Sequence, residues 1–230
     1  SSAASDVYKR QVLLVRDGER WLAATVRPAD VRIEPLANMA GEPRDTVVLD
    51  GVKPHELARL PAGIGHDALR LRGALSRAML MAGALERMSE LTVEYTNQRR
   101  QFGRPVAAFQ AVQIHLVNGA QDAALVTMAA QQAAAALQAG PLAAFEIASA
   151  KLLAGEVAHS ATKAAHQAHG AMGMTQEYPL HHFSRRLWSW RSEYGDERYW
   201  AVRLGRAVAS AGAETLYPAI TAGSGAITQV

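Results

Sequence analysis

A short stretch at residues 97–105 carries the side chains best suited to hold an anionic ligand. It places Arg99, Arg100 and Arg104 at the expected end of one helix, just before the next helix begins. Arginine binds phosphate through two parallel hydrogen bonds, and the N-terminus of a helix favours anions. The ring of Phe102 could stack on a planar group. These residues indicate a phosphate-bearing ligand, and the alternative from composition is a solvated basic turn.

Two further groups of polar or small residues lie on segments that are otherwise apolar. Gln110 and Gln113 follow Phe109 on an expected helix, and a glutamine side chain both donates and accepts hydrogen bonds. Gly170 and Gly173 follow a run with several histidines, and the lack of a side chain lets a ligand approach the backbone there. Because no carboxylate lies at a matching spacing, these histidines favour packing or hydrogen bonding, and no metal site is predicted.

The segment at residues 181–200 combines arginines with three of the four tryptophans of the chain. Aromatic residues and arginine are enriched at interaction hot spots, which favours an interface or a stacking surface over plain core. Glu193 lies alone between Glu177 and Asp196, and its bulky apolar neighbours could desolvate it, as a general base requires. Glu193 is therefore the candidate catalytic residue, and a surface ion pair with Arg191 is the alternative.

Composition excludes several kinds of chemistry. The 230 residues include no cysteine, which excludes disulfides, thiol catalysis and zinc–thiolate sites. The chain contains no Ser–His–Asp order, no Walker loop and no strand-borne Gly-x-Gly-x-x-Gly sequence. A net charge of +3 is too small and too dispersed for a nucleic-acid-binding surface. With 49% hydrophobic and 20% charged residues, the composition is that of a globular protein.

No apolar run approaches the length of about 18 residues that a membrane span needs. The first residues are small and polar, unlike a signal peptide, and they lack an initiator methionine. We therefore expect the first ten or so residues to be a processed, cloned or partial end that is non-native or disordered, and a cytoplasmic location is the default expectation.

The elements that must position these residues divide the chain into two parts. Short β-branched and apolar runs, separated by prolines and Asp-Gly turns, predict strands at 12–15, 21–26, 31–33 and 46–52. Apolar residues then recur every three or four positions, which predicts helices at 67–98, 106–138, 142–168, 180–190 and 196–211. The expected fold class is mainly α, an antiparallel four-helix bundle preceded by a small β segment. The expected domains are a partial β domain at 1–65 and a C-terminal helical bundle at 66–230.

From about Ala68 to Gly205, the chain resembles the C-terminal domain of the acyl-CoA dehydrogenases. The preceding strands, with Asp50-Gly51-Val52, resemble the end of that family's middle β domain. The resemblance depends on three spaced motifs in combination: Arg99-x-x-Phe102-Gly103-x-Pro105-x-x-x-Phe109-Gln110, Gln167-x-x-Gly170-x-x-Gly173 and Glu177-Tyr178-Pro179-Leu180.

The resemblance implies a reaction and a cofactor. Members of the family oxidise an acyl-CoA thioester between Cα and Cβ, where a glutamate removes the α proton while the β hydride goes to FAD. The flavin lies at a subunit interface, and the family's contacts to the FAD of the neighbouring subunit fall here on Arg99, Phe102, Gln110, Gln167 and Gly170. The implied partners are an acyl-CoA substrate, an acyl-CoA dehydrogenase subunit in a homo- or hetero-oligomer, and an electron-transferring flavoprotein.

The chain departs from the family at the catalytic carboxylate. Counted without gaps from Tyr178-Pro179, the family's common catalytic glutamate falls on Tyr194, one residue after Glu193. Some members carry the glutamate on the helix before the first motif, and that position falls near Gly73. The threonine and glutamine that follow the glutamate in the family are also replaced here, by Asp196 and Arg198.

Three functions follow as alternatives. The first is an FAD-dependent acyl-CoA dehydrogenase-type oxidoreductase, present as a fragment or shortened subunit, with Glu193 as its base. The second is a non-catalytic partner subunit of a hetero-oligomeric acyl-CoA dehydrogenase, which supplies half of the FAD site and the oligomer interface. The third is an alanine-rich helical oligomerisation domain that binds no flavin. Because most of the family's N-terminal and β domains lie outside these 230 residues, we expect the chain alone not to frame a full active site.

Overall fold

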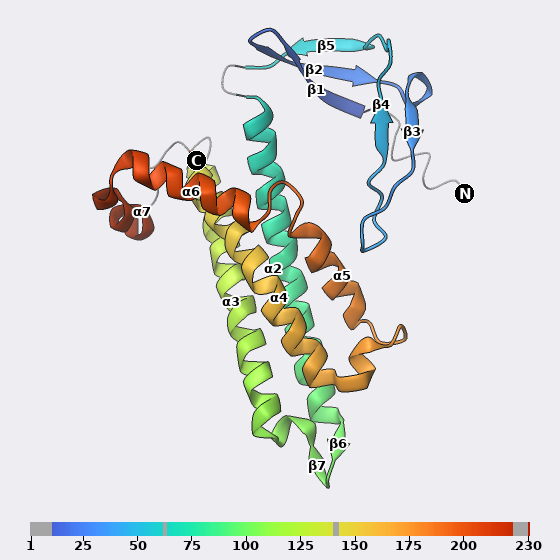
Figure 1. The fold of residues 1–230 in the computed structure, drawn as a ribbon, viewed down its shortest axis with the longest axis vertical. Coiled ribbons are helices and arrows are strands. Elements are labelled where there is room, and N and C mark those ends of the chain that lie inside the picture. The colour runs from blue at the N-terminus through green and yellow to red at the C-terminus, as the bar shows by residue number, and fades with distance from the viewer. Residues whose placement is uncertain (1–10, 62–63, 140–142, 223–229) are drawn as a thin grey trace. The chain divides into compact units, whose positions relative to one another are not determined.

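A computed structural model describes residues 11–61, 64–139, 143–222 and 230 (Figure 1). The chain is mainly helical and divides into two compact units, residues 1–69 and residues 70–230. The expectation for the first ten residues lies outside the described part of the chain.

The smaller unit contains a three-stranded antiparallel sheet in the order β1-β2-β5. Strand β1 (Gln11–Asp17) pairs with β2 (Arg20–Val26) through a two-residue turn at Gly18 and Glu19, where Gly18 has a φ of +60°. Strand β5 (Glu56–Arg59) pairs with the other edge of β2. The expected strands at 12–15 and 21–26 are confirmed, whereas β5 was not expected, because its sequence Glu-Leu-Ala-Arg does not alternate and all four residues are exposed.

A second pair of strands completes the β part. Strand β3 (Arg32–Glu34) follows a short 3-10 turn, η1 (Pro28–Asp30), and pairs antiparallel with β4 (Thr46–Val48). Strand β4 ends four residues before the expected end at residue 52. The chain turns at Gly51, where φ is +63°, and glycine tolerates this left-handed conformation without steric cost.

The helical unit is built around three long helices, α2 (His66–Gln98), α3 (Gln110–Ala139) and α4 (Ala144–His169) (Figure 1). Helices α3 and α4 pack side by side and run antiparallel, since Ser160 bonds to Asp122 while Phe145 and Gln132 share one groove. The core that they enclose is rich in alanine, and α4 buries more than half of its residues. Small side chains let these helices approach each other closely.

Short elements surround these helices. A two-stranded hairpin, β6 (Arg100–Gln101) and β7 (Arg104–Pro105), and a 3-10 turn, η2 (Val106–Ala108), join α2 to α3. A second 3-10 turn, η3 (Gly170–Met174), leads to α5 (Leu180–Trp190) and α6 (Glu197–Ala211). The chain then forms η4 (Ala213–Thr215) and α7 (Leu216–Ala222). None of the described helices is both long enough and apolar enough to cross a membrane.

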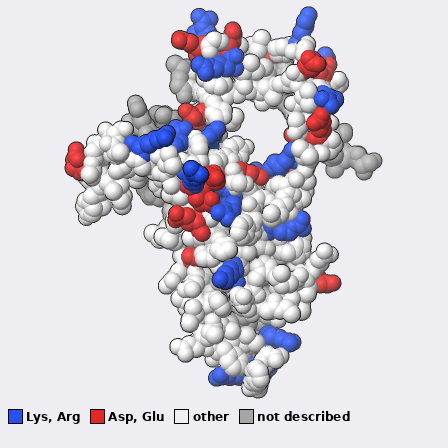
Figure 2. Space-filling model, viewed as in Figure 1, with Lys and Arg blue, Asp and Glu red and all other residues white. Residues whose placement is uncertain are grey.

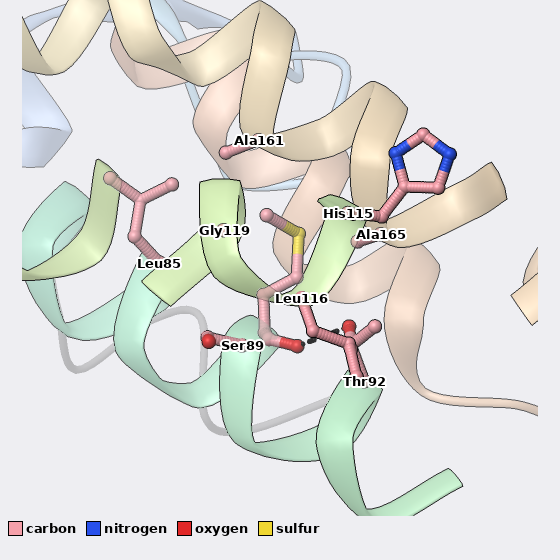
Figure 3. Close-up of a pocket in the computed structure, with 9 residues that line it drawn as sticks. Leu85, Ser89, Thr92, His115, Leu116, Gly119, Ala161 and Ala165 are labelled. Carbon is pink, nitrogen blue, oxygen red and sulfur yellow. Dashed lines mark hydrogen bonds between the residues drawn. The ribbon is translucent and has the colours of Figure 1, made fainter. Parts of the chain in front are cut away.

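A small cavity lies between α2, α3 and α4 (Figure 3). Its volume is about 10 Å³, and Leu85, Ser89, Thr92 and Gly119 are among the residues that line it. A site of this size holds at most about one water molecule. The hydroxyl of Thr92 is already engaged, because it donates to the carbonyl of Met88 at 2.7 Å. This cavity is too small for a cofactor.

Candidate functional site

The hairpin between α2 and α3 presents the first sequence motif (Figure 1). Its strands pair Arg100 with Pro105 and Gln101 with Arg104, so the turn consists of Phe102 and Gly103. Both turn residues have positive φ values, 50° for Phe102 and 80° for Gly103, as in the tight turns that match the twist of a hairpin. Asparagine, aspartate or glycine usually occupies the first of these positions, so phenylalanine is unusual there.

Phe102 is both strained and exposed. A left-handed conformation costs a residue with a side chain about 1 kcal/mol or more, and a bulky ring adds to this cost. The side chain is nevertheless 91% exposed, and the ring contact described for it is an edge-on one with Phe109, with 6.1 Å between the ring centroids. Burial within this chain therefore does not offset the strain. A large apolar ring held outward in this way has the form expected of a residue that contacts another molecule.

Three arginines lie on or beside the hairpin that carries Phe102. Arg100 donates to the carbonyl of Gly103 at 2.9 Å, and the Arg104 guanidinium lies 4.1 Å from the centroid of the Phe109 ring. Arg99 is exposed, and within the described residues no carboxylate is paired with any of the three. Lys and Arg atoms accordingly appear without Asp or Glu atoms at this tip of the helical unit (Figure 2). An unpaired cluster of guanidinium groups beside an aromatic ring suits an anionic ligand with a planar part.

The two other predicted cofactor segments are exposed at the same end of the helical unit. Gln110 is the first residue of α3, directly after the hairpin and η2, and its side chain is exposed. Gln167 is exposed on the last turn of α4, which ends at Gly170. The φ of Gly170 is +59° and open space surrounds it, so glycine is required for its conformation and not for packing.

An aromatic cluster joins the end of α4 to the end of α2. The His169 ring stacks on Tyr95 at 4.6 Å and meets Tyr178 at 4.9 Å. His169 is buried, and its Nδ1 lies 2.8 Å from the carbonyl oxygen of Ala165, which can only accept, so Nδ1 carries the proton. Burial lowers the pKa of His169, which keeps the ring neutral at neutral pH. The sequence favoured packing and hydrogen bonding for this histidine, and both are confirmed.

The residues predicted for catalysis lie in the loop between α5 and α6, residues 191–196 (the α5–α6 loop). The Glu193 carboxylate accepts a hydrogen bond from Nε of Arg77, on α2, at 2.5 Å, and less than a fifth of either side chain is exposed. The ion pair considered from the sequence, between Glu193 and Arg191, does not form. Arg191 instead pairs with Glu197 at 2.8 Å. Glu193 is therefore partly buried, as a base requires, and already engaged by a guanidinium group.

Tyr194 and Gly73 meet in the structure. Tyr194 has a φ of +59°, and its ring lies against the backbone of Gly73 on α2. A Cβ atom at Gly73 would overlap the Tyr194 ring, far inside van der Waals contact. The guanidinium of Arg77 lies 5.8 Å from the same ring. The two positions at which the resemblance places a catalytic glutamate are thus neighbours in space, and a tyrosine packed on a glycine occupies them.

Lys151 was not predicted to take part in any site. It lies on α4 with 1% of its surface exposed, and Nζ donates to the carbonyls of Arg191 at 2.6 Å and Gly195 at 3.0 Å. Burial lowers the pKa of Lys151 to about 8, against the opposing effect of the charges on Glu197, Asp196 and Glu193. The sequence did contain a signal, because Lys151 lies among the alanines of the buried stripe of α4.

Comparisons with known proteins place this geometry in a family. The family described as "Acyl-CoA dehydrogenase, C-terminal domain" matches residues 71–197, more than half of the chain. Acyl-CoA dehydrogenase FadE27 of Mycobacterium tuberculosis (strain ATCC 25618 / H37Rv) is 46% identical over 48 residues, 21% of this chain and 13% of that protein. The ChsE4–ChsE5 complex from Mycobacterium tuberculosis is 25% identical with a TM-score of 0.77, over 89% of this chain and 57% of the matched chain.

The FAD complex of PigA shares the fold, with 19% identity and a TM-score of 0.74 over 90% of this chain and 58% of the other. The chain spans less than a quarter of the length of the curated relatives that it matches and less than three fifths of these two solved chains. The family match covers both the hairpin and the loop with Glu193. This chain therefore belongs to the acyl-CoA dehydrogenase family, and its residues 71–197 correspond to the C-terminal domain of that family.

Proposed function

We propose that this chain takes part in the FAD-dependent α,β-dehydrogenation of an acyl-CoA thioester, and that its hairpin contacts a flavin held by a neighbouring subunit. The observation that carries the proposal is the exposed, left-handed Phe102 among three arginines that no carboxylate neutralises in the described residues. The Phe102 side chain gains little burial within the chain to offset the strain of its backbone. A ligand bound from outside the chain accounts for it.

The residues at this end of the helical unit fit the chemistry of FAD. Arg99 would bind the pyrophosphate, Phe102 would stack on a planar part, and Gln110, Gln167 and Gly170 would contact the adenosine part. The hydrogen-bonding groups match, since guanidinium groups favour phosphate and glutamine both donates and accepts. PigA, which shares the fold, is known as an FAD complex. When bound, FAD accepts the hydride that leaves Cβ of the acyl group.

Within this reaction, Glu193 is the proposed base of the chain, which takes the α proton from the thioester. Its carboxylate is mostly shielded from water, as proton abstraction at carbon requires. Arg77 would have to release Oε2, or the second carboxylate oxygen would have to take the proton. The test is Glu193→Gln in the assembled enzyme with Arg77 left intact, because the amide keeps the shape of the side chain and cannot accept a proton. Loss of turnover with unchanged substrate binding is the expected result, and unchanged turnover would contradict the role.

A second form of the function assigns the base to a partner subunit, and the packing of Tyr194 favours it. The ring of Tyr194 fills the space over Gly73, so neither family position for the glutamate is free to hold one. Glu193, the nearest carboxylate in sequence, is bonded to Arg77. The chain would then be a non-catalytic subunit of a hetero-oligomer that supplies half of the FAD site. A solved chain of similar fold is part of a complex between ChsE4 and ChsE5.

Helix α3 supports an oligomeric role in either form. Its 30 residues include a single charged one, Asp122, which accepts a hydrogen bond from Ser160 of α4. The outward side instead carries apolar side chains that are half exposed or more, at Ile114, Val117, Leu125 and Met128. A helix face without charge is unusual in contact with water and is typical of an interface. We propose an acyl-CoA dehydrogenase subunit, either a copy or a homologue, as its partner, with an electron-transferring flavoprotein as electron acceptor.

Co-purification separates the two forms of the function. The tagged chain is isolated from cells that also express a full-length homologue that retains the family's glutamate, and flavin and acyl-CoA turnover are measured. A complex that turns over acyl-CoA and is unaffected by Glu193→Gln in this chain supports the partner role. A complex that loses turnover with Glu193→Gln supports a base within this chain. A chain that neither associates nor binds flavin contradicts both forms and leaves the alanine-rich oligomerisation domain.

A further inference from the structure

Lys151 joins α4 to both ends of the α5–α6 loop. Its ammonium group donates to the carbonyl of Arg191, at the C-cap of α5, and to the carbonyl of Gly195, just before α6. The carbonyls at a helix C-terminus lack partners within the helix and carry a partial negative charge. A buried cation at this place satisfies both carbonyls from a single side chain. The loop that carries Glu193 and Tyr194 is thus held at both ends from one point on α4.

The loop is shaped to fit over this part of α4. One turn after Lys151, Gly155 leaves room for the carboxylate of Glu197, which a Cβ atom at Gly155 would overlap. Glu197 uses that room to pair with Arg191, so the same face of α4 supports the loop twice. Gly195 has a φ of +106°, and a Cβ atom there would lie 2.6 Å from the ring of Tyr199. The loop therefore has little freedom once Lys151 is in place.

We infer that Lys151 is a positioning residue, which holds the α5–α6 loop so that Tyr194 stays left-handed against Gly73 and Glu193 stays beside Arg77. From a separate helix, the Lys151 ammonium group bonds to the carbonyls at both ends of this loop. The burial of a lysine needs such a reason, because an apolar side chain of similar length would avoid the cost of removing the charge from water. The purpose assigned to the loop rests on the proposed function, but the positioning itself concerns this chain alone and needs no flavin.

A double-mutant cycle between Lys151 and Gly73 tests the inference. Gly73→Ala forces a Cβ atom into the Tyr194 ring only while the ring is held in place. In Lys151→Met the side chain keeps its approximate shape and loses both hydrogen bonds, so the loop can move away. The matched control is Lys163→Met, which removes an exposed lysine from the same helix. The measurement is urea unfolding of the full chain, followed by tryptophan fluorescence, in each single and double variant.

The expected result is energetic coupling between positions 73 and 151, which are not in contact. The factor by which Gly73→Ala raises the unfolding equilibrium constant should fall about tenfold in Lys151→Met, and remain unchanged in Lys163→Met. Trypsin should also cleave after Arg191 faster in Lys151→Met than in Lys163→Met. An equal effect of Gly73→Ala with and without Lys151 would overturn the inference, since a lysine with only a local structural role gives independent effects.

A further variant keeps the test decisive if Lys151→Met does not fold. Lys151→Gln retains two N–H donors on a shorter side chain, and the same cycle with Gly73→Ala is measured in that background. A smaller effect of Gly73→Ala than in the wild type is again expected, and an equal effect again overturns the inference. Because neither readout depends on FAD or on a partner subunit, a negative result here is distinguishable from failure of the proposed function.

Discussion

The α2–α3 hairpin and the α5–α6 loop share one local backbone conformation, but they differ in what the aromatic side chain contacts. Each places an aromatic residue with positive φ directly before a glycine with positive φ, Phe102-Gly103 in the hairpin and Tyr194-Gly195 in the loop. Phe102 is 91% exposed, whereas Tyr194 is 44% exposed and packs on Gly73. The strain of the loop is offset by contacts within the chain. The strain of the hairpin is not, which is why we place its binding partner outside the chain.

Charge follows the same division. In the loop, Arg77 is paired with Glu193 and Arg191 with Glu197, so the cations are neutralised on site. In the hairpin, the three arginines have no carboxylate partner among the described residues. The α5–α6 loop thus pairs its charges within the chain. The charges of the α2–α3 hairpin suit the binding of an anion. This difference separates the part of the chain that holds its structure from the part that we propose contacts a ligand.

The largest difference between the two regions is expected in their response to pH. Burial lowers the pKa of Lys151 from 10.5 to about 8, while residues 99–105 of the hairpin include no lysine, tyrosine or histidine. Below pH 8 the folded and unfolded chains both hold the lysine proton. Between pH 8 and 10.5 only the unfolded chain holds it, so the free energy of unfolding rises with pH. The rise is at most about 3 kcal/mol, at 1.4 kcal/mol for each pKa unit.

Urea unfolding near pH 7 and near pH 10.5 measures this rise, with Lys151→Met as the control that removes it. Glu193, Asp196, Glu197 and Arg191 are the charged residues that act on the ammonium group, and all four are retained in Lys151→Met. An equal dependence on pH in the wild type and in Lys151→Met would contradict a buried, charged lysine beneath the loop.

The next largest effect is expected at Gly73. We expect Gly73→Ala to lower the free energy of unfolding by about 2 kcal/mol, because the new methyl group overlaps the Tyr194 ring. Gly83→Ala on the same helix is the matched control, since nothing lies within 4 Å of that position. There the change should raise stability by up to about 1 kcal/mol, through helix propensity alone. If Gly73→Ala and Gly83→Ala change thermal and urea unfolding alike, the packing of Tyr194 on Gly73 is refuted.

A smaller effect of opposite sign is expected at Phe102. Phe102→Gly removes the left-handed strain and loses little packing, so the isolated chain should keep its stability or gain up to about 1 kcal/mol. The same change in the loop, Tyr194→Gly, should lower stability by about 2 kcal/mol, because it removes a packed ring. Paired thermal unfolding curves compare the two. A clear loss of stability in Phe102→Gly would mean that the hairpin packs within the chain and does not present the ring to a ligand.

The smallest effect on stability, and a large one on assembly, is expected on α3. Met128 is 70% exposed, so Met128→Glu should change the free energy of unfolding by less than about 0.5 kcal/mol. A charge at this position should nevertheless disrupt the proposed oligomer, whereas Met128→Gln should leave it intact. Sedimentation velocity of both variants measures the oligomeric state. If the wild type and Met128→Glu sediment identically, the outer face of α3 is not part of the interface.

The helices and the hairpin motif were accessible from the sequence because each has a local cause. Apolar residues at a spacing of three and four predict α2, α4 and α5 to within two residues at each end. The buried face of a helix can be predicted in this way because its residues recur at a fixed spacing in the sequence. Helix α3 begins four residues later than expected, because residues 106–108 form the 3-10 turn η2. Strand β5 was missed because its sequence has no strand-like alternation. It is defined by hydrogen bonds to β2, which lies more than 30 residues earlier in the chain.

The contacts within the loop could not be derived from the sequence, because they depend on residues that are far apart in the chain. Nothing local pairs Glu193 with Arg77, 116 residues away, or selects Arg77 over Arg191. Tyr194 and Gly73 were each identified as departures from the family, but only the fold shows that they are in contact. Lys151 gave a signal as a charged residue on an apolar stripe, and its carbonyl partners come from a loop 40 residues later.

The most direct test of the account is a titration of FAD with the purified chain, followed by flavin fluorescence, in the wild type and in three variants. We predict weak binding that is lost on desalting, because the chain supplies only one half of the site. Arg99→Met and Phe102→Ala should each weaken it about tenfold, as expected for the loss of one charge-assisted hydrogen bond or one stacked ring. Arg206→Met, an exposed arginine on α6, should bind FAD as the wild type does. Equal affinity in all four proteins, or no binding in any of them, would contradict the assignment of the hairpin to a flavin.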